Sequence, residues 1–427
     1  MERGLYDLSH FTFMQGRIGR LQTLTTIPVC AGDSIELSLQ GVLRLSPLRR
    51  NLTVDALCDL FVFYQPHRHA YGEDWENFIL QGTDESITFP TVDFSTNTLE
   101  HYGTCRLTGV NPKWIVTMYN RIWNRYFRVP SDDASILTDT DISPAPDLNY
   151  ARFGKLCARL KKIWTTGVDI TTDASDREVA AASSTMDILD LARVQARYRS
   201  EQLRDWFGRR YTDILEANFG GSAGTDADER PTLLMRNTAY LSGYDVDGTD
   251  DASLGTFSGK SVTVANIGIP RRFIPEHGAI MVMALVRFPT IHQDETHYLI
   301  KKSQPTYIEI SGDGALWENE PPINHQVQDF FTNNSSTQSL ATMPYGQWYR
   351  EHPNIVHDGY RELTGFPFLN NAPTSLDTAR YVQDLDYSST FQTEQQGHWQ
   401  MQGRVDVMAH RSIPGPLVSV FAGSNAK

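Results

Sequence analysis

Short apolar runs, rich in β-branched and aromatic residues, occur in three separate parts of the chain. The first part covers residues 21–64, where glycines and a proline interrupt the runs. The second begins near residue 261 and continues to about 310. In the third, apolar residues alternate with polar ones over 405–409, and another short run follows at 417–421. Runs of this kind are typical of β-strands, and their close spacing in the first part favours antiparallel pairing.

Between the first two strand-rich parts the apolar residues recur at four-residue steps. One helix is predicted where such residues share a face, at Trp114, Met118, Ile122 and Tyr126. More helix is predicted over 186–207, ending near the glycine pair at 220–221. Ser184 and Asp187 have the spacing of a capping box at its start. The helices therefore form an insertion between strands.

Strands early, helices in the middle and strands again near the end fit one β-barrel whose opposite edges come from distant parts of the chain. Eight strands of about six residues account for only ~50 residues, so most of the chain would be connections. Polar stretches at 131–149 and 332–340 are predicted surface loops. We expect a single domain over 1–427, with long insertions at approximately 76–260 and 311–400.

Composition indicates a folded globular protein, with 40% hydrophobic and 21% charged residues. A net charge of −13 argues against binding nucleic acid over the whole surface. The charge is uneven, because 73–150 is acidic whereas 151–210 is basic. The longest apolar run, 279–286, is far shorter than the ~20 residues of a membrane-spanning helix. With no apolar segment of a signal peptide near the start, we expect folding in a cytoplasm and no membrane partner.

Two stretches resemble known ligand-binding loops, but the spacing of their residues differs from the spacing that those motifs require. GTFSGKS, at 255–261, ends like a phosphate-binding loop but has one residue too few between its glycines, and a strand pattern follows it. The carboxylates Asp245, Asp247, Asp250 and Asp251 resemble a calcium loop with its glycine at the wrong position. A turn is expected there, and Asp245, Asp247 and Asp250 are kept as weak cation candidates.

The four cysteines, at positions 30, 58, 105 and 157, contain no C-x-x-C pair, which excludes a zinc ribbon. Buried, unpaired thiols in a reducing compartment are expected. The G-x-S-x-G motif of serine hydrolases is also missing.

One stretch has the ligand order of some metalloenzymes. In FVFYQPHRHAYGEDW, residues 61–75, His67, His69 and Glu73 follow the pattern H-x-H-x-x-x-E. If a strand ran through this stretch, both histidines would project from one face and Glu73 could complete a metal triad. Pro66 and the lack of a second cupin motif favour hydrogen-bonded histidines at a corner where a strand becomes a loop. A cupin-like metalloenzyme is kept as the alternative function.

A series of short sequences then gives a specific resemblance. In chain order they are DLSH (7–10), IGRL (18–21), AGDS (31–34), LRLSPLRR (43–50), PHRH with YGEDW (66–75), SGYDVDGTD (242–250), IPEHG (274–278), ALVRFP (284–289), GQWYR (346–350) and GFPF (365–368). With them the chain resembles the major capsid proteins of the phiX-type Microviridae, small icosahedral bacteriophages with single-stranded DNA. The resemblance covers roughly 7–369 and is weaker over 83–165 and beyond residue 370.

The resemblance implies a mainly β fold, an eight-stranded antiparallel jelly roll with large inserted loops containing a few helices. It implies a structural protein of the virion, not an enzyme, with no cofactor. Sixty copies would build a T=1 shell around a circular single-stranded DNA genome, assembled in the host bacterial cytoplasm. The implied partners are further copies of the chain, a spike protein, internal and external scaffolding proteins, a pilot protein and a small basic DNA-binding protein. A jelly-roll lectin that binds carbohydrate is a third alternative.

Clusters of basic residues in this acidic chain are the candidates for DNA contact. The first set is Arg44, Arg49 and Arg50, and the second is Lys161 with Lys162. Aromatic residues beside them would stack on unpaired bases.

Overall fold

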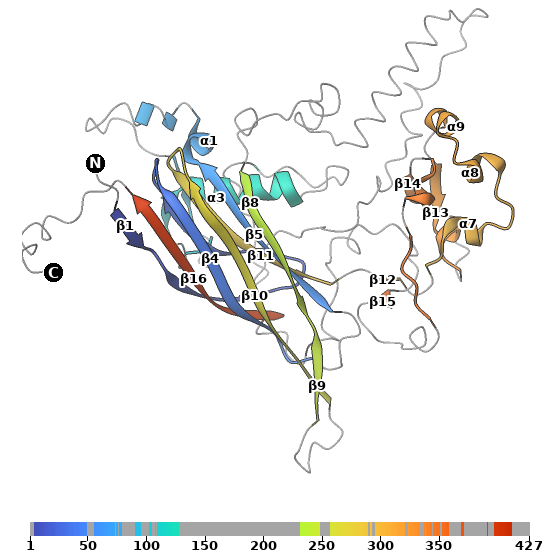
Figure 1. Cartoon of the computed structure of the whole chain (residues 1–427), viewed down its shortest axis with the longest axis horizontal. Helices are drawn as coiled ribbons and strands as arrows, with labels where there is room; N and C mark the ends of the chain where they lie inside the picture. Colours follow the sequence, from blue (N-terminus) through green and yellow to red (C-terminus); the bar gives the residue numbers. More distant parts are fainter. Residues whose placement is uncertain are drawn as a thin grey trace, which may run out of the picture.

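The structure is a computed structural model, and it describes residues 4–48, 55–72, 74–75, 77–78, 90–94, 102–104, 107, 109–127, 138, 231–247, 257–288, 291–292, 295–320, 323–332, 337, 339–343, 345–350, 352–357, 369–370, 391 and 397–411. Within these ranges the chain is mainly β-strand, as predicted, and its long strands form two sheets (Figure 1). No helix in the same ranges is long and apolar enough to cross a membrane.

The first sheet has the strand order β1-β16-β4-β10-β9, and β2 also pairs with β16. Its members are β1 (Gly4–Asp7), β2 (His10–Gly16), β4 (Ser34–Leu45), β9 (Gly243–Asp247), β10 (Phe257–Phe273) and β16 (Trp399–Arg411). All neighbouring strands in it are antiparallel. The sheet therefore joins segments from the two far ends of the sequence.

The second sheet has the order β3-β11-β5-β8, again with antiparallel neighbours. Its members are β3 (Leu21–Val29), β5 (Ala56–Pro66), β8 (Thr232–Leu241) and β11 (Gly278–Arg287). Along the chain the eight long strands pair from the outside inwards: β2 with β16, β3 with β11, β4 with β10, and β5 with β8. This nested pairing over two sheets is the topology of a jelly roll, which confirms the expected fold class.

Residues at every second position of the strands fill the space between the two sheets. Along β4, buried residues alternate with more exposed ones, because successive side chains of a strand point to opposite faces. Leu37 and Leu39 of β4 share one hydrophobic core with Val407 of β16 and Ile280 of β11. Trp399, at the start of β16, is fully buried in the same core.

Strand β11 is buried on both faces, which explains the long apolar run in the sequence. Val282 faces the core between the sheets, whereas Met281 and Met283 face a second hydrophobic cluster on the other side. Helix α3 (Trp114–Ile122) covers that side with Met118 and Ile122. A π-helical turn, η1 (Trp123–Phe127), continues α3. The helix predicted in this region is therefore confirmed.

Shorter elements connect and extend the sandwich. They are α1 (His67–Tyr71), β6 (Thr91–Asp93), β7 (Val110–Pro112), β12 (Ile291–His292), α7 (Tyr298–Lys301), α8 (Tyr307–Ser311), α9 (Gly314–Asn319), β13 (Ile323–Gln326), α10 (Val327–Phe330), β14 (Ser339–Met343), η3 (Gln347–Tyr349) and β15 (Leu369–Asn370). In Figure 1, α7, α8 and α9 lie with β13 and β14 on one side of the sandwich.

The strand pattern expected over 297–310, at the end of the second strand-rich part, is wrong, because this segment forms the helices α7 and α8. A capping box explains why α8 begins where it does: the backbone N–H of Thr306 donates to Glu309, and the Thr306 side chain accepts from the backbone N–H of Glu309. Gly312 ends the helix in the left-handed conformation, with φ of 67°. The capping box at the start of α8 and the glycine at its end thus favour a helix over the expected strand.

Several predictions fall on residues outside the described ranges. They concern the helix over 186–207 with its capping box, the strand over 417–421 and most of the loop over 131–149. Of the cysteines, Cys58 is a buried free thiol and Cys30 a partly buried one, whereas Cys105 and Cys157 lie outside the described ranges. The division into one domain with two long insertions stays a prediction.

A buried carboxylate joins three strands of the second sheet. Asp59 of β5 has no exposed side-chain surface, and its Oδ1 accepts hydrogen bonds from Arg236 at 2.9 Å and Thr238 at 2.6 Å, both on β8. Its Oδ2 accepts from Arg287 of β11 at 2.8 Å. Burial raises the pKa of Asp59, but the hydrogen bonds outweigh this and the net pKa is lowered. The charged carboxylate therefore fastens β8 and β11 to β5.

Replacing Asp59 by Ala should destabilise the subunit strongly, because two arginines would lose their buried partner. We expect a loss of about 3 kcal/mol or more in the free energy of unfolding, measured by urea titration of the purified chain. Asp406→Ala is the matched control, since Asp406 and Arg404 form an ion pair in which both side chains are largely exposed. It should cost less than about 1 kcal/mol. Equal losses in the two variants would contradict this role of Asp59.

Candidate functional site

The outer face of the first sheet, called the sheet face below, is defined by three rows of aligned residues. Across β2, β16, β4 and β10 the rows are Gln15–Gln400–Arg44–Val262, Phe13–Gln402–Val42–Val264 and Phe11–Arg404–Gln40–Asn266. These positions alternate with the inward residues of the core, so they point away from it. Phe11 and Phe13 are 68% and 73% exposed, which is unusual for aromatic side chains.

Among the predicted DNA-contact residues, Arg44 is an exposed side chain in the first row of the sheet face. Arg49 and Arg50 follow β4 closely in the sequence but lie outside the described ranges, as do Lys161 and Lys162. The structure thus places one candidate on an open sheet surface and leaves the other four as predictions.

The two histidines, His67 and His69, do not have the geometry of a metal-binding site. Strand β5 ends at Pro66, and His67 begins the short helix α1, so the pair is helical and not extended. Residues two positions apart point to different sides of a helix, whereas a strand would place them on one side. Glu73 lies outside the described ranges. Strand β5 thus ends at the predicted corner, but the chain continues there as the helix α1 and not as a loop. The helix removes the basis for a cupin-like triad.

Both histidines take part in packing at this corner. The ring of His67 lies 5.0 Å from Trp114 and 5.1 Å from Trp75 between centroids, and burial together with the nearby His277 lowers its pKa to about 4. His67 is therefore neutral at physiological pH. The carbonyl oxygen of His69 accepts a hydrogen bond from Arg121, on the neighbouring helix α3.

The described parts of the two stretches that resembled ligand sites lie in two paired strands. Asp245 and Asp247 belong to β9, which pairs with the beginning of β10, and Asp250 lies outside the described ranges. The lysine of GTFSGKS lies in β10, where a strand takes the place of the helix that a phosphate-binding loop requires. Among the described residues no group of three or more His, Cys, Asp or Glu side chains is arranged to hold a metal ion.

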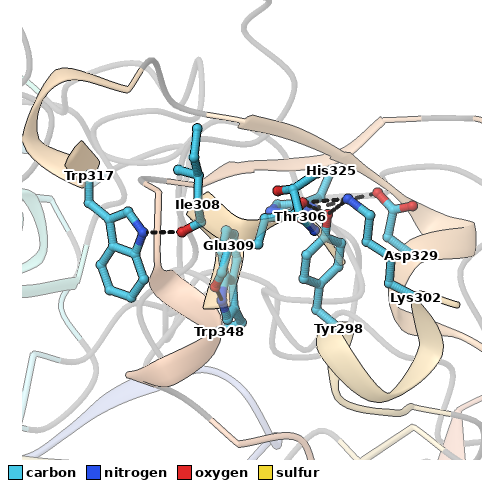
Figure 2. A network of polar contacts seen from close by, with 9 residues as sticks. All are labelled: Tyr298, Lys302, Thr306, Ile308, Glu309, Trp317, His325, Asp329 and Trp348. Atoms are coloured by element: carbon cyan, nitrogen blue, oxygen red, sulfur yellow. Dashed lines mark hydrogen bonds and ion pairs between the residues drawn. The ribbon is translucent and has the colours of Figure 1, made fainter. Parts of the chain in front are cut away.

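A network of polar contacts holds together the helices α7 and α8 (Figure 2). The carboxylate of Glu309, 5% exposed, accepts hydrogen bonds from the hydroxyl of Tyr298 at 2.9 Å and from Lys302. Its second oxygen accepts from the backbone N–H of Thr306 at 2.7 Å. Burial raises the pKa of Glu309, but the hydrogen bond from Lys302 and those from the other donors outweigh it, so the pKa falls to about 2.

Two tryptophans connect this network to the rest of the segment. The indole N–H of Trp348 donates to the carbonyl oxygen of Glu309 at 3.2 Å, and that of Trp317 donates to Ile308 at 2.6 Å. The buried ring of His325 lies edge-on to Tyr298, with 4.8 Å between centroids. In Figure 2 the contacts of Tyr298, Lys302 and Glu309 lie close together, apart from the hydrogen bond between Trp317 and Ile308. The network therefore gives short helices the support that their own length cannot provide.

Sequence reasoning missed both Glu309 and the exposed phenylalanines. The spacing T-x-x-E at 306–309 was available as a capping signal. HFTFMQG, at 10–16, has the alternation of a strand, but only pairing with β16 reveals which face is covered. No local signal could provide that information.

Comparison with known proteins identifies the family of the chain. The family model described as "Capsid protein (F protein)" matches residues 1–181 and 174–421. The chain belongs to this family of phage capsid proteins. It is 42% identical over 424 residues to "Capsid protein F" of Escherichia phage G4, covering 98% of each chain. It is also 40% identical to "Capsid protein F" of Escherichia phage alpha3 over 424 residues, covering 97% of this chain and 96% of the relative.

A third capsid protein F, from Enterobacteria phage phiK, is 40% identical over 421 residues. Because the matches run along nearly the whole chain, membership of the capsid protein family applies to the complete sandwich and to the segments between its strands. The resemblance to microvirid capsid proteins found in the sequence is therefore confirmed. This membership gives the chain a structural role.

Acid should weaken the Glu309 network in a defined pH range. Because the pKa of Glu309 is lowered from 4.5 to about 2, its contribution to stability is complete above pH 4.5 and is lost as the pH falls towards 2. Glu309→Gln should lower stability at pH 7 by about 2 kcal/mol, and the difference from the wild type should shrink on acidification. Urea titrations at several pH values measure both effects.

Glu276→Gln is the control for this experiment. Glu276 pairs with Arg68 at 3.1 Å, but both side chains are about one third exposed. Its replacement should change the free energy of unfolding by less than about 1 kcal/mol at pH 7. A difference between Glu309→Gln and the wild type that stays constant from pH 7 to pH 2 would show that the carboxylate charge is not what stabilises the network.

Proposed function

We propose that this protein is the major structural subunit of a small icosahedral shell that encloses a circular single-stranded DNA genome. The observation that carries the proposal is the identity of about 40% to named capsid F proteins over nearly the full length. The proposed shell is of the T=1 kind with sixty copies, and the subunit performs no catalysis. Its place is the virion, after assembly in the host bacterial cytoplasm.

The physical properties of the fold suit this role. A shell subunit needs a rigid body and several different contact surfaces, because each symmetry axis joins different patches of the same chain. Two hydrophobic clusters on the two sides of the second sheet provide rigidity. The long segments that connect the strands supply surfaces that vary without disturbing the core.

The proposed partners are other copies of the chain, a spike protein, internal and external scaffolding proteins, a pilot protein and a small basic DNA-binding protein. The net charge of −13 supports the last of these, since an acidic subunit cannot neutralise a packed genome by itself. Local basic patches on the subunit would supplement such a partner. Arg44, Arg49 and Arg50 remain the proposed first patch, and Lys161 with Lys162 the second.

The alternative, a cupin-like metalloenzyme, has no support in the geometry of the histidine pair. The carboxylates Asp245, Asp247 and Asp250 remain weak cation candidates. Nothing in the packing of β9 against β10 favours a ligand there over a simple hairpin.

Co-expression of this chain with its neighbouring viral genes should yield small isometric particles in electron micrographs. The physical reason is that a shell subunit reaches its stable state only when its contact surfaces are buried against other copies and partners. The same set of genes without this chain is the control and should yield no particles. Absence of particles when every partner is present and the chain is folded would contradict the proposal.

Reversing the charge at the first basic patch should weaken binding of the genome. For Arg49→Glu with Arg50→Glu, we expect less DNA in each particle. The log–log salt dependence of oligonucleotide binding should fall by about one to two units, because two phosphate contacts are lost. Arg271→Glu with Arg272→Glu makes the same change at exposed positions of β10 and should leave both quantities near wild type. Unchanged particle yield and DNA content in the first variant would remove this patch from the proposal.

A further inference from the structure

Hydrogen bonds join the parts of residues 295–357, called the side lobe below, to one another. In Figure 1 the elements α7, α8, α9, β13 and β14 of the side lobe lie together beside the sandwich. The backbone N–H of Thr296 donates to the carbonyl oxygen of Phe330 at 2.7 Å, and Nε2 of His297 donates to the carbonyl oxygen of Trp348 at 2.7 Å. The beginning of the side lobe is therefore fastened to its middle and to its end.

The hydrophobic cores of the sandwich do not extend into the side lobe. Among the described residues, the two hydrophobic clusters take their buried members from 14–288 and 391–409. In the described part of the side lobe the buried apolar side chains are Tyr298, Phe331 and Trp348. Since burial of apolar surface is the dominant stabilising contribution in a folded protein, opening of the side lobe would leave that of the sandwich almost unchanged.

Polar and ring contacts around two buried groups hold the side lobe together. One group is the carboxylate of Glu309, which accepts hydrogen bonds from Tyr298 and Lys302 (Figure 2). The other is the fully buried ring of His325, which lies edge-on to Tyr298 with 4.8 Å between centroids. Because Tyr298 contacts both groups, the loss of one contact weakens the others.

Several apolar side chains of the side lobe are exposed. Ile300 is 76% exposed, Tyr307 77% and Ile355 60%. The helices α7, α8 and α9 have four, five and six residues, which is too short for a helix to be stable by itself in water. Short helices with little apolar burial are typical of segments that open locally, at a lower free energy than the whole fold.

We propose that the side lobe is a separate cooperative unit, which opens and closes in the folded subunit while the sandwich stays intact, and that the contacts of Glu309 hold it closed. The subunit thus has a rigid body and one part that changes conformation. The loss of stability expected for Glu309→Gln falls on the side lobe and not on the sandwich. The inference does not depend on the proposed function, because it concerns the single chain before any assembly.

Hydrogen exchange of the purified full-length chain at pH 7, measured by mass spectrometry of its peptides, tests the inference. In the wild type, the hydrogen-bonded amides of the side lobe should exchange at least about tenfold faster than those of β4, β5 and β11, because only the side lobe has to open. Glu309→Gln should accelerate exchange in the side lobe by a further tenfold or so, since the charged acceptor is lost. The three strands should keep their wild-type rates.

Tyr307→Ala is the matched control, since this change lies on α8 at an exposed side chain and should leave every exchange rate unchanged. Asp59→Ala is the converse experiment. It should accelerate exchange in β5, β8 and β11, while the side lobe keeps its rate because it opens without unfolding the sandwich. If Glu309→Gln does not fold, Tyr298→Phe removes one hydrogen bond to Glu309 and keeps the ring, and it should accelerate exchange in the side lobe by a smaller factor.

Three results would overturn the inference. The first is exchange in the wild-type side lobe as slow as in β11. The second is equal acceleration of the side lobe and the sandwich by Glu309→Gln, which would make them one cooperative unit. The third is wild-type exchange of the side lobe in the folded Glu309→Gln and Tyr298→Phe variants, which would show that other contacts hold it closed. Failure of the proposed function is distinguishable, because absence of particles on co-expression would leave these exchange rates unchanged.

Discussion

The burial of β11 and β5 on both faces is the constraint on which the rest of the molecule depends. Each strand must contribute one set of side chains to the core between the sheets and the other set to the cluster beneath α3. A one-residue shift in register would exchange the two sets, so the register is strongly specified. The second sheet thereby becomes the middle layer, between the first sheet and the helix α3.

The charged groups of the structure fall into two kinds, buried carboxylates and exposed ion pairs. Asp59 and Glu309 are buried, and each receives several hydrogen bonds, because an unpaired buried charge costs several kcal/mol. Pairs such as Arg404 with Asp406 are exposed and contribute little to stability. Stability and recognition are thus assigned to different residues, which allows the sheet face to change without unfolding the subunit.

The strands around β3, β4 and β5 and the helix α3 were predictable, because periodicity is a local property of the sequence. The end of strand β5 at Pro66 was also predictable, since proline cannot continue the hydrogen bonds of a strand, but the helix α1 that follows was expected to be a loop. The segment over 297–310 was expected to be strand because of its β-branched and aromatic residues, whereas the capping residues Thr306 and Glu309 begin a helix there. Strands from distant parts of the chain were expected to meet in one barrel, but the pairing of β2 with β16 was not predicted, since a local pattern does not specify which strands are neighbours.

The closure of the first sheet has a consequence for how the subunit folds. The backbone N–H of Ile18 donates to His398, a hydrogen bond that spans 380 residues, and β4 acquires its neighbour β16 from the same late part of the chain. Contacts with such large sequence separation form slowly, because much of the chain entropy is lost before they are made. During synthesis, one edge of β4 would therefore remain unpaired until β16 has left the ribosome. Premature association of incomplete chains through that edge is the hazard that the cell and the virus must control.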